Sequence, residues 1–404
     1  MSVLTNKEIR QFKSCEDLIQ PFGLDHFLAN YHEKDKLIID RNDPDYYQGL
    51  FSLDEVDTVL DTGRPRDESL RIVKNQVPLL PTKYQQADGS LNLNQIYTAY
   101  ADGYTIVINE LDRYSYPVKT LCQSLSHELS YAVKANMYLT PKKQSALLPH
   151  YDTHDVFILQ IHGKKHWRLY DSPVETPMLH SHQPVFRREH LRNMQEITLN
   201  AGDFMYMPRG LPHEAYTTDE SSLHITVGIY PSQWADLLAK TIHQLAMAQP
   251  QFRKALPAGF LRQEKWNKEF YKAFNDQFLA LLQEVAKVNN PMAAVGLLSE
   301  DLRGQNTPKG DGHFRMLDQM DELTLNSVVF RRDGINSTVQ PAGAACRIIF
   351  PGNVIKGPSH IAPALRFISE ATEPFKLSEL PSINDTNKVK LAARLIRGGL
   401  LRVV

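Results

Sequence analysis

The sequence predicts a mostly β protein with α-helices, in which a double-stranded β-helix (jelly roll) precedes a helical region and a winged-helix-like domain. Many short apolar runs, separated by turn residues, lie between residues 104 and 230. After residue 231 the apolar residues recur at helical spacing. The chain then closes with a strand, a helix, a short segment, a helix and a strand. We therefore expect domains at 1–230, 231–314 and 315–404.

The bulk composition is that of a globular protein with two or three domains. The 404 residues include 45 basic and 46 acidic side chains, so the net charge is −1 and favours neither nucleic acid nor an anionic membrane. No signal-peptide pattern opens the chain, and no apolar run approaches the length of a membrane span. The three cysteines lie far apart and suggest no disulfide framework. We expect a cytoplasmic protein that does not enter a membrane.

The first 75 or so residues are expected to lead into the β-domain through short helices and strands. Ser52 followed by Glu55 is a capping-box pattern that opens a helix. Further on, the alternation over 132–140 ends at Pro141 and predicts a strand. Side chains at positions 136, 138 and 140 would share one face of that strand, because alternate residues point the same way.

The next stretch, 149–170, reads PHYDTHDVFILQIHGKKHWRLY. Residues 156–160 predict a buried strand, and the residues at 162–164 predict a turn that leads into a hairpin partner over 165–170. Further strands are expected over 195–199, 203–207 and 223–230. These strands would enclose a cavity, and side chains that are distant in the sequence would face it together.

His150 and Asp152 are candidate metal ligands. Residues two apart on an extended strand point the same way, so an imidazole and a carboxylate would reach one point. Two histidines and one carboxylate form the facial triad that holds non-haem Fe(II) and leaves coordination positions open. The best candidate for the third ligand is His213, and His224 on a later predicted strand is its main rival.

Together, the HYD-containing stretch and the later segment GDFMYMPRGLPH resemble the JmjC/cupin-type 2-oxoglutarate oxygenases, and among them the ribosomal oxygenases. The resemblance implies a catalytic domain over 1–230 that binds Fe(II), takes 2-oxoglutarate as cosubstrate and uses O2. It also favours His213 over His224, because the family places its distal ligand in PRGxxH. The resemblance further implies that 231–314 is a helical dimerisation domain, so we expect a homodimer.

In the family, a basic residue fifteen positions after the first histidine pairs with the distal carboxylate of 2-oxoglutarate. Lys165 occupies that position, and Lys164 should face away from it by strand alternation. Hydrogen bonds to the cosubstrate are expected from Asn136, Tyr138 and Thr226. Arg209 would either shape the mouth of the substrate site or form a salt bridge.

The last two domains carry weaker functional signals. The apolar stripe over 266–288 could form a core or a dimer face, since periodicity does not separate the two. Residues 303–314 read as a loop or linker. The winged-helix pattern comprises a strand at 345–350, helices at 362–371 and 385–396, and a strand at 400–404. From Asp321 onwards there are eleven Lys and Arg against seven Asp and Glu, a small excess that makes DNA binding unexpected.

The resemblance therefore implies an Fe(II)- and 2-oxoglutarate-dependent hydroxylase of a ribosomal protein, acting on a His or Arg side chain. Lysine at position 165 favours histidine, because bacterial relatives that hydroxylate arginine tend to carry arginine there. The same chemistry on RNA or on N-methyl-lysine is an alternative. A non-catalytic metal-binding cupin is another.

Overall fold

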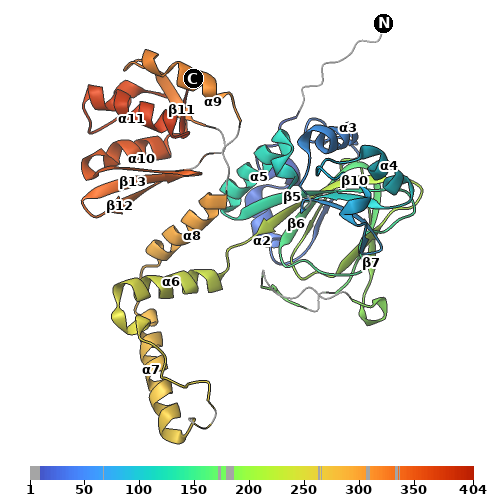
Figure 1. Cartoon of the computed structure of the whole chain (residues 1–404), viewed down its shortest axis with the longest axis horizontal. Coiled ribbons are helices and arrows are strands. Elements are labelled where there is room, and N and C mark those ends of the chain that lie inside the picture. Colours follow the sequence, from blue (N-terminus) through green and yellow to red (C-terminus); the bar gives the residue numbers. More distant parts are fainter. Residues whose placement is uncertain are drawn as a thin grey trace. The chain divides into compact units, whose positions relative to one another are not determined.

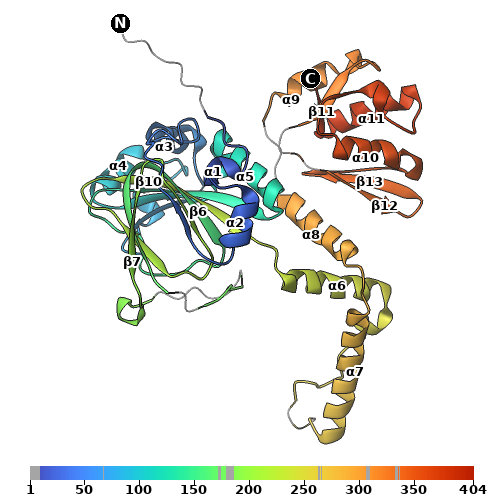
Figure 2. The same cartoon turned by 180° about the vertical axis from the view of Figure 1, so that it is seen from behind.

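The structure is a computed structural model of the whole chain (Figures 1 and 2). It describes residues 10–66, 68–171, 174–178, 186–262, 264, 266–305, 310–332, 335 and 337–404. The chain divides into two compact units, Met1–Pro231 and Ser232–Val404.

An antiparallel β-sheet that curves into a barrel dominates the first unit. Its ten strands are β1 (Leu37–Ile39), β2 (Leu70–Lys74), β3 (Val77–Pro78), β4 (Thr105–Ile108), β5 (Ala132–Thr140), β6 (Asp155–Leu169), β7 (Gln195–Asn200), β8 (Phe204–Met207), β9 (His213–Tyr216) and β10 (Ser222–Tyr230). The strand order is β1-β8-β6-β10-β5-β4-β2-β3, and β7 and β9 also pair with β6. This antiparallel core confirms the β-domain of the predicted fold class.

One prediction about these strands was wrong. Residues 156–160 and 165–170 do not form a hairpin, because β6 runs unbroken from Asp155 to Leu169. Its first part pairs with β8 and β10, and its last part pairs with β7 and β9. Gly163 allows the change of partners: its φ is +66°, and a Cβ there would lie 1.9 Å from the Ser221 carbonyl oxygen. The glycine that suggested a turn instead lets one strand change its neighbours within the sheet.

Helices of the lead-in cover part of this barrel. They are α1 (Glu16–Ile19), α2 (Leu24–Asn30), α3 (Leu53–Thr58), α4 (Leu93–Ala101) and α5 (Tyr116–Leu129). Ser52 caps α3 as its pattern predicts, since its hydroxyl accepts a hydrogen bond from the Glu55 N–H at 3.3 Å. Apolar residues of α5 and β5 belong to one buried cluster with those of β6 and β10. The core therefore lies between the helices and the barrel wall, which keeps the barrel strands in register.

The second unit joins an extended helical part to a small α/β part. The helices are α6 (Trp234–Ala248), α7 (Lys268–Ala286), α8 (Met292–Gln305), α9 (His313–Asp318), α10 (Ala362–Glu370) and α11 (Asp385–Arg397). The strands form two three-stranded sheets, β15-β11-β16 and β12-β13-β14. Their bounds are β11 (Val328–Arg331), β12 (Thr338–Ala342), β13 (Ala345–Phe350), β14 (Asn353–Pro358), β15 (Phe375–Lys376) and β16 (Leu401–Val403).

The small α/β part has its own hydrophobic core, built around α10 and α11. The succession β13, α10, β15, α11 and β16 follows the order read from the sequence, but β11, β12 and β14 were not expected. Of the predicted linker, 306–309 lies outside the described residues. Among the described helices, none has both the length and the apolar character needed to cross a membrane.

Candidate metal centre

His150 and Asp152 do not lie on a regular strand, as the spacing argument assumed, but in the segment just before β6. His150 forms an isolated antiparallel bridge with His213, the first residue of β9. The His213 N–H donates to the His150 carbonyl at 2.7 Å, and the His150 N–H donates back to the His213 carbonyl at 3.0 Å. This backbone pairing holds two histidines 63 positions apart opposite each other.

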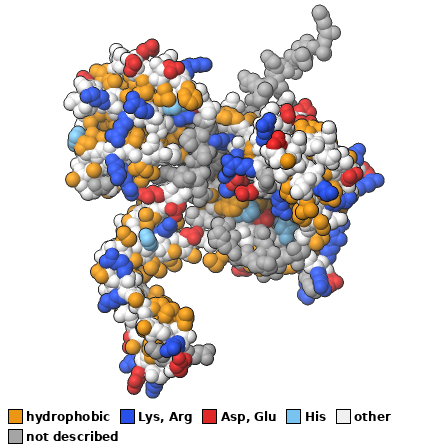
Figure 3. All heavy atoms as spheres, viewed as in Figure 1, with side chains coloured by type: hydrophobic (Ala, Val, Ile, Leu, Met, Phe, Trp, Pro, Cys, Tyr) orange, Lys and Arg blue, Asp and Glu red, His pale blue; other side chains and the backbone are white. Residues whose placement is uncertain are grey.

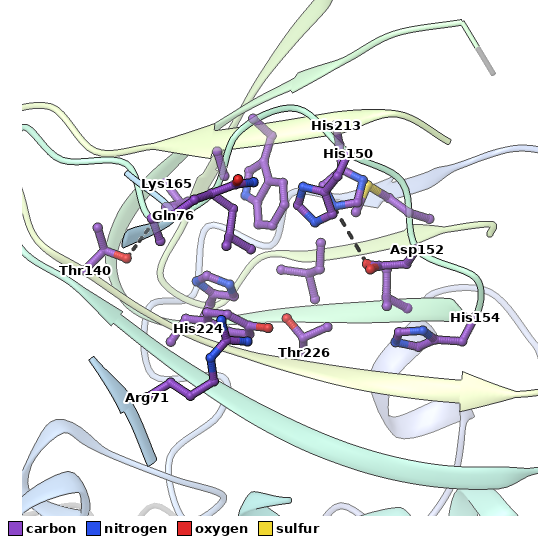
Figure 4. A pocket seen from close by; sticks show the side chains of 18 residues that line it. Arg71, Gln76, Thr140, His150, Asp152, His154, Lys165, His213, His224 and Thr226 are labelled. Atoms are coloured by element: carbon purple, nitrogen blue, oxygen red, sulfur yellow. Dashed lines mark hydrogen bonds and ion pairs between the residues drawn. The ribbon is translucent and has the colours of Figure 1, made fainter. Parts of the chain in front are cut away.

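The side chains of His150, Asp152 and His213 converge inside the barrel (Figure 4). One ligand atom from each lies within 4.8 Å of the other two. The Nε2 of His213 is 3.8 Å from Asp152 Oδ2, and the two imidazole centroids are 4.6 Å apart. Two imidazoles and one carboxylate in this arrangement have the donor set of a facial triad for a divalent metal.

Contacts to the backbone set the tautomer of both histidines. The Nδ1 of His150 lies 2.8 Å from the Leu148 carbonyl, and the Nδ1 of His213 lies 3.0 Å from the Leu211 carbonyl. Each ring therefore donates its Nδ1–H to the backbone and leaves Nε2 unprotonated for a metal. Burial, helped by the neighbouring His150, lowers the pKa of His213 to about 4, so the ring is a neutral ligand at pH 7.

The three side chains line a cavity of about 370 Å³. Its polar lining comprises Arg71, Gln76, Tyr138, Thr140, His150, Asp152, His154, Lys165, His213, His224 and Thr226. The apolar lining comprises Ala146, Leu147, Val156, Ile158, Trp167, Met207 and Ala215. A concave cavity with a few convergent polar groups is the usual form of a small-molecule site.

Lys165 is a buried cation of this cavity, with a side chain only 2% exposed. Its ammonium donates to the Thr140 hydroxyl at 2.9 Å, and burial lowers the pKa of Lys165 to about 7. Among the described residues no carboxylate pairs with it. Lys164 points out of the cavity and lies 3.5 Å from Glu220. An anionic ligand in the cavity would therefore give Lys165 the partner that its buried charge needs.

Of the other three residues predicted to contact the cosubstrate, two line the cavity and one does not. Tyr138 and Thr226 line the cavity, on the paired strands β5 and β10. Asn136 does not belong to the lining, and its side-chain oxygen accepts the backbone N–H of Glu110 at 3.0 Å. Tyr138 stacks on His224, with ring centroids 5.0 Å apart and planes within 5°. The structure thus brings Tyr138 and Thr226, but not Asn136, to the same cavity as the three candidate ligands.

Arg209 lies away from the cavity lining and contacts two carboxylates, of which Asp155 is buried and Glu33 is exposed. Its guanidinium is 2.5 Å from Glu33 and 3.9 Å from Asp155. Its backbone N–H donates to Asp155 Oδ1 at 2.8 Å. Of the two roles considered for this arginine, the salt bridge is the one that the contacts support.

Several residues of the cavity were not selected as ligands, or were not identified at all, from the sequence. His224 is buried and lines the cavity, but it is not part of the three-residue ligand cluster. His154 lines the cavity beside Asp152 and stacks on Tyr230, with centroids 4.5 Å apart. Arg71 and Gln76 were not identified from the sequence. Alternation along β2, where Arg71 stands between two buried residues, was the available signal, but it does not say which cavity that face meets.

Comparisons with known proteins agree with this site. Residues 114–237, which contain all three candidate ligands, match the family model of the JmjC domain. The chain is 32% identical over 243 residues to an Aedes aegypti protein named bifunctional lysine-specific demethylase and histidyl-hydroxylase NO66. That alignment covers 57% of this chain and 37% of the relative.

Ribosomal oxygenase 2 of Bos taurus is 32% identical over 258 residues, which are 61% of this chain and 54% of the relative. This chain therefore spans about a third to just over half of the length of these curated relatives. The predicted resemblance to JmjC-type ribosomal oxygenases is confirmed at the level of these similarities.

Solved structures share the fold over nearly the whole chain. The structure of Escherichia coli ycfD has a TM-score of 0.57 and 15% identity, with 95% of this chain and 99% of that chain covered. A structure described as the E. coli ribosomal oxygenase YcfD in complex with cobalt and 2-oxoglutarate has a TM-score of 0.54 and 16% identity, over 94% and 98% of the two chains. At such identities the likeness establishes the fold.

Proposed function

We propose that this chain, whose residues 114–237 match the JmjC domain model, is an Fe(II)- and 2-oxoglutarate-dependent oxygenase that hydroxylates a side chain of a ribosomal protein. One observation carries the proposal: a convergent His150–Asp152–His213 triad lines the same cavity as Lys165, a buried cation without a carboxylate partner among the described residues. The triad can hold a divalent metal and the lysine can hold an anion. A cosubstrate that chelates the metal and ends in a carboxylate would use both.

The triad is proposed to hold Fe(II) through His150 Nε2, His213 Nε2 and a carboxylate oxygen of Asp152. Three protein ligands leave coordination positions for 2-oxoglutarate and O2. When bound, this group supplies the oxidative chemistry, in which 2-oxoglutarate is converted to succinate and CO2 as a C–H bond of the substrate is hydroxylated.

The protein contributes orientation and exclusion of water. Lys165 is proposed to pair with the distal carboxylate of 2-oxoglutarate, with Thr140 holding the ammonium in place. Tyr138 and Thr226 are proposed as further hydrogen-bond partners from the paired strands β5 and β10. Trp167 and Ile158 supply apolar walls, and a low-dielectric wall strengthens the attraction between the lysine and the carboxylate.

The ribosomal substrate rests on the kinds of protein that this chain resembles, which include proteins named ribosomal oxygenase and histidyl-hydroxylase. A lysine at position 165 favours a histidine target over an arginine target, on the family pattern. The names of relatives also include a lysine-specific demethylase, so N-methyl-lysine in a protein is the second candidate substrate. With a ribosomal substrate, the protein would act in the cytoplasm.

We further propose that the protein is a homodimer and that a second copy covers the faces of α6 and α7. None of the residues of α7 is buried. Large apolar side chains are exposed on both helices, and Figure 3 shows apolar side chains gathered over α7. The exposed residues are Trp234, Leu238, Ile242, Met247, Tyr271, Phe278, Leu279 and Leu282. Contiguous apolar exposure of this kind is typical of an interface.

Mass spectrometry of ribosomal proteins tests the proposed activity. Ribosomal proteins from cells without this protein would be incubated with the purified chain, Fe(II), 2-oxoglutarate and O2. We expect one protein to gain the mass of one oxygen atom on a single histidine, with no gain when His150→Ala replaces the wild type. His166→Ala is the matched control, because this histidine contacts Thr198 and Thr218 and lies outside the triad.

Two results would contradict the proposal. Full activity of His150→Ala would exclude the metal centre. A wild-type enzyme that turns over 2-oxoglutarate but leaves every ribosomal protein unchanged would keep the chemistry and exclude the substrate. Loss of a methyl group from a methyl-lysine peptide would instead identify the second candidate substrate.

A further inference from the structure

The two histidines of the candidate metal centre lie on segments that differ in their backbone pairing. His150 belongs to no regular strand, whereas all four residues of β9 pair with the end of β6. The two segments pair with each other through His150 and His213, and the Gly210 N–H donates to the Asp152 carbonyl at 2.9 Å. Backbone pairing thus fixes β9 on β6, and side chains that link β9 to the His150 segment would set the separation of the two histidines.

Glu214, the neighbour of His213 on β9, is the first such side chain. It points away from the cavity lining and is only 3% exposed. Its carboxylate accepts two hydrogen bonds from the Arg188 Nε, at 3.0 and 3.1 Å, and one from Arg188 Nη2 at 2.6 Å. The Tyr170 hydroxyl donates a further bond at 2.7 Å, and Arg168 lies 3.8 Å away. A forked arginine–carboxylate contact of this kind fixes orientation as well as charge.

Arg188 belongs to a segment that also contacts the other histidine's neighbours. It begins the short 3₁₀ turn Arg188–His190. Two residues earlier, the Phe186 N–H donates to the Pro149 carbonyl at 2.8 Å. The Phe186 ring lies 6.0 Å from that of Tyr151. The segment thus touches Pro149 and Tyr151 on either side of His150, and it touches Glu214 beside His213.

We propose that Arg188 and Glu214 are positioning residues, which hold the His150 and His213 segments at the separation that a metal requires. The inference rests on the proposed function, since it concerns the same metal centre. Ligand oxygens and nitrogens lie about 2.0–2.2 Å from a bound first-row metal, so a shift of an ångström in one segment would remove a ligand. Arg188 does not line the cavity, so it would act on the metal centre through Glu214.

The chain offers a matched pair of variants to test this. Arg188 is 63% exposed, and Tyr170 and Arg168 remain beside Glu214 in Arg188→Ala, so the overall fold should persist. Arg187 is the adjacent, more exposed arginine, and its contact is with Glu189 at 3.8 Å. Arg187→Ala therefore removes the same charge from the same segment without touching β9. Arg188→Lys keeps the positive charge but loses the paired guanidinium donors. Glu214→Gln keeps a hydrogen-bond acceptor for Tyr170 but loses the negative charge.

The measurement is the affinity of the full-length, metal-stripped protein for Mn(II), followed by the loss of the free Mn(II) signal in electron paramagnetic resonance. We expect Arg188→Ala and Glu214→Gln to weaken Mn(II) binding about tenfold or more, in the range typical of partners that orient metal ligands. Arg188→Lys should recover part of the loss, and Arg187→Ala should bind within about twofold of the wild type. At saturating metal, the KM for 2-oxoglutarate should stay unchanged, because Lys165 is outside this cluster.

Either of two results would overturn the proposal: Mn(II) binding by Arg188→Ala as tight as that of the wild type, or an equal loss in Arg187→Ala. Thermal unfolding of each variant separates a general loss of structure from a local one. If the wild-type protein itself bound no Mn(II), the proposed function would fail with it. If the wild type bound Mn(II) and Arg188→Ala bound it equally well, only the positioning role would fail.

Discussion

The two units of this protein differ from a typical globular domain in opposite ways, one in the charges that it buries and the other in the apolar side chains that it exposes. The first unit buries polar and charged side chains, among them Lys165, His213, Glu214 and His224. The second leaves large apolar side chains exposed on α6 and α7, although α10 and α11 of the same unit bury theirs. Burying a charge opposes folding, and an apolar face that stays in water contributes nothing to stability. Each is tolerated where it serves another purpose, which we propose to be ligand binding in the first unit and self-association in the second.

The largest effect should come from the buried charge of the first unit. Lys165→Met keeps the length of the side chain but removes the cation, so the distal carboxylate of 2-oxoglutarate would be buried without a partner. We expect the KM for 2-oxoglutarate to rise about a thousandfold, equivalent to roughly 4 kcal/mol. Lys164→Met is the control, because that lysine faces Glu220, and its KM should change less than about twofold. Equal effects of the two variants would remove Lys165 from the site.

Two glycines with similar positive φ angles allow the packing around a backbone bend to be compared between the two units. Gly163 on β6 has φ +66° and Gly343 after β12 has φ +64°. A Cβ at Gly163 would lie 1.9 Å from a backbone oxygen, whereas nothing lies within 4 Å of one at Gly343. We expect Gly163→Ala to lower the free energy of unfolding by at least about 3 kcal/mol and Gly343→Ala by about 1 kcal/mol. Urea unfolding measures both, and similar values would mean that β6 needs no close approach at its bend.

Two leucines of the second unit separate its core from its exposed helices. Leu395 on α11 is fully buried, and Leu282 on α7 is exposed. Leu395→Ala should cost about 3 kcal/mol of unfolding free energy, and Leu282→Ala less than about 1 kcal/mol at low protein concentration. If a second copy covers α7, Leu282→Ala should shift the dimer towards monomer in analytical ultracentrifugation. A wild-type protein that stays monomeric at high concentration would exclude the proposed dimer.

A smaller effect should follow from the pH dependence of cosubstrate binding. Burial lowers the pKa of Lys165 to about 7, well below that of a lysine in the unfolded chain. The ammonium needed to pair with a carboxylate is therefore present below pH 7 and is lost above it. The KM for 2-oxoglutarate should rise about fivefold between pH 7 and pH 8, and this dependence should disappear in Lys165→Met.

A KM that is flat across this range in the wild type would mean that the bound cosubstrate keeps Lys165 charged throughout. The same pKa shift also affects the stability of the free protein. Because the neutral lysine is the form that folding favours, the free energy of unfolding should increase as the pH rises from about 7 towards about 10.

The sequence by itself determined the fold class and the three convergent side chains. Strand alternation and turn residues predicted the β-domain, helical periodicity predicted α7 and α11, and the HYD and PRGxxH motifs selected His150, Asp152 and His213. These signals are local, or they depend on residue types that a metal requires, so they survive without knowledge of distant contacts.

Only the tertiary structure decided how those pieces meet. A glycine at position 163 is compatible with a turn or with a bend in a continuous strand. The pairing of β6 with β10 before the glycine and with β7 after it produces the bend. Arg209 could have faced a cavity or a carboxylate, and the lead-in residue Glu33, 176 positions away in the sequence, supplied the carboxylate. Arg71 reaches the cavity because β2 pairs with β4 in the sheet that encloses it. Local preference cannot rank such alternatives, because the energy that separates them comes from pairing and burial between residues that the chain brings together only when it folds.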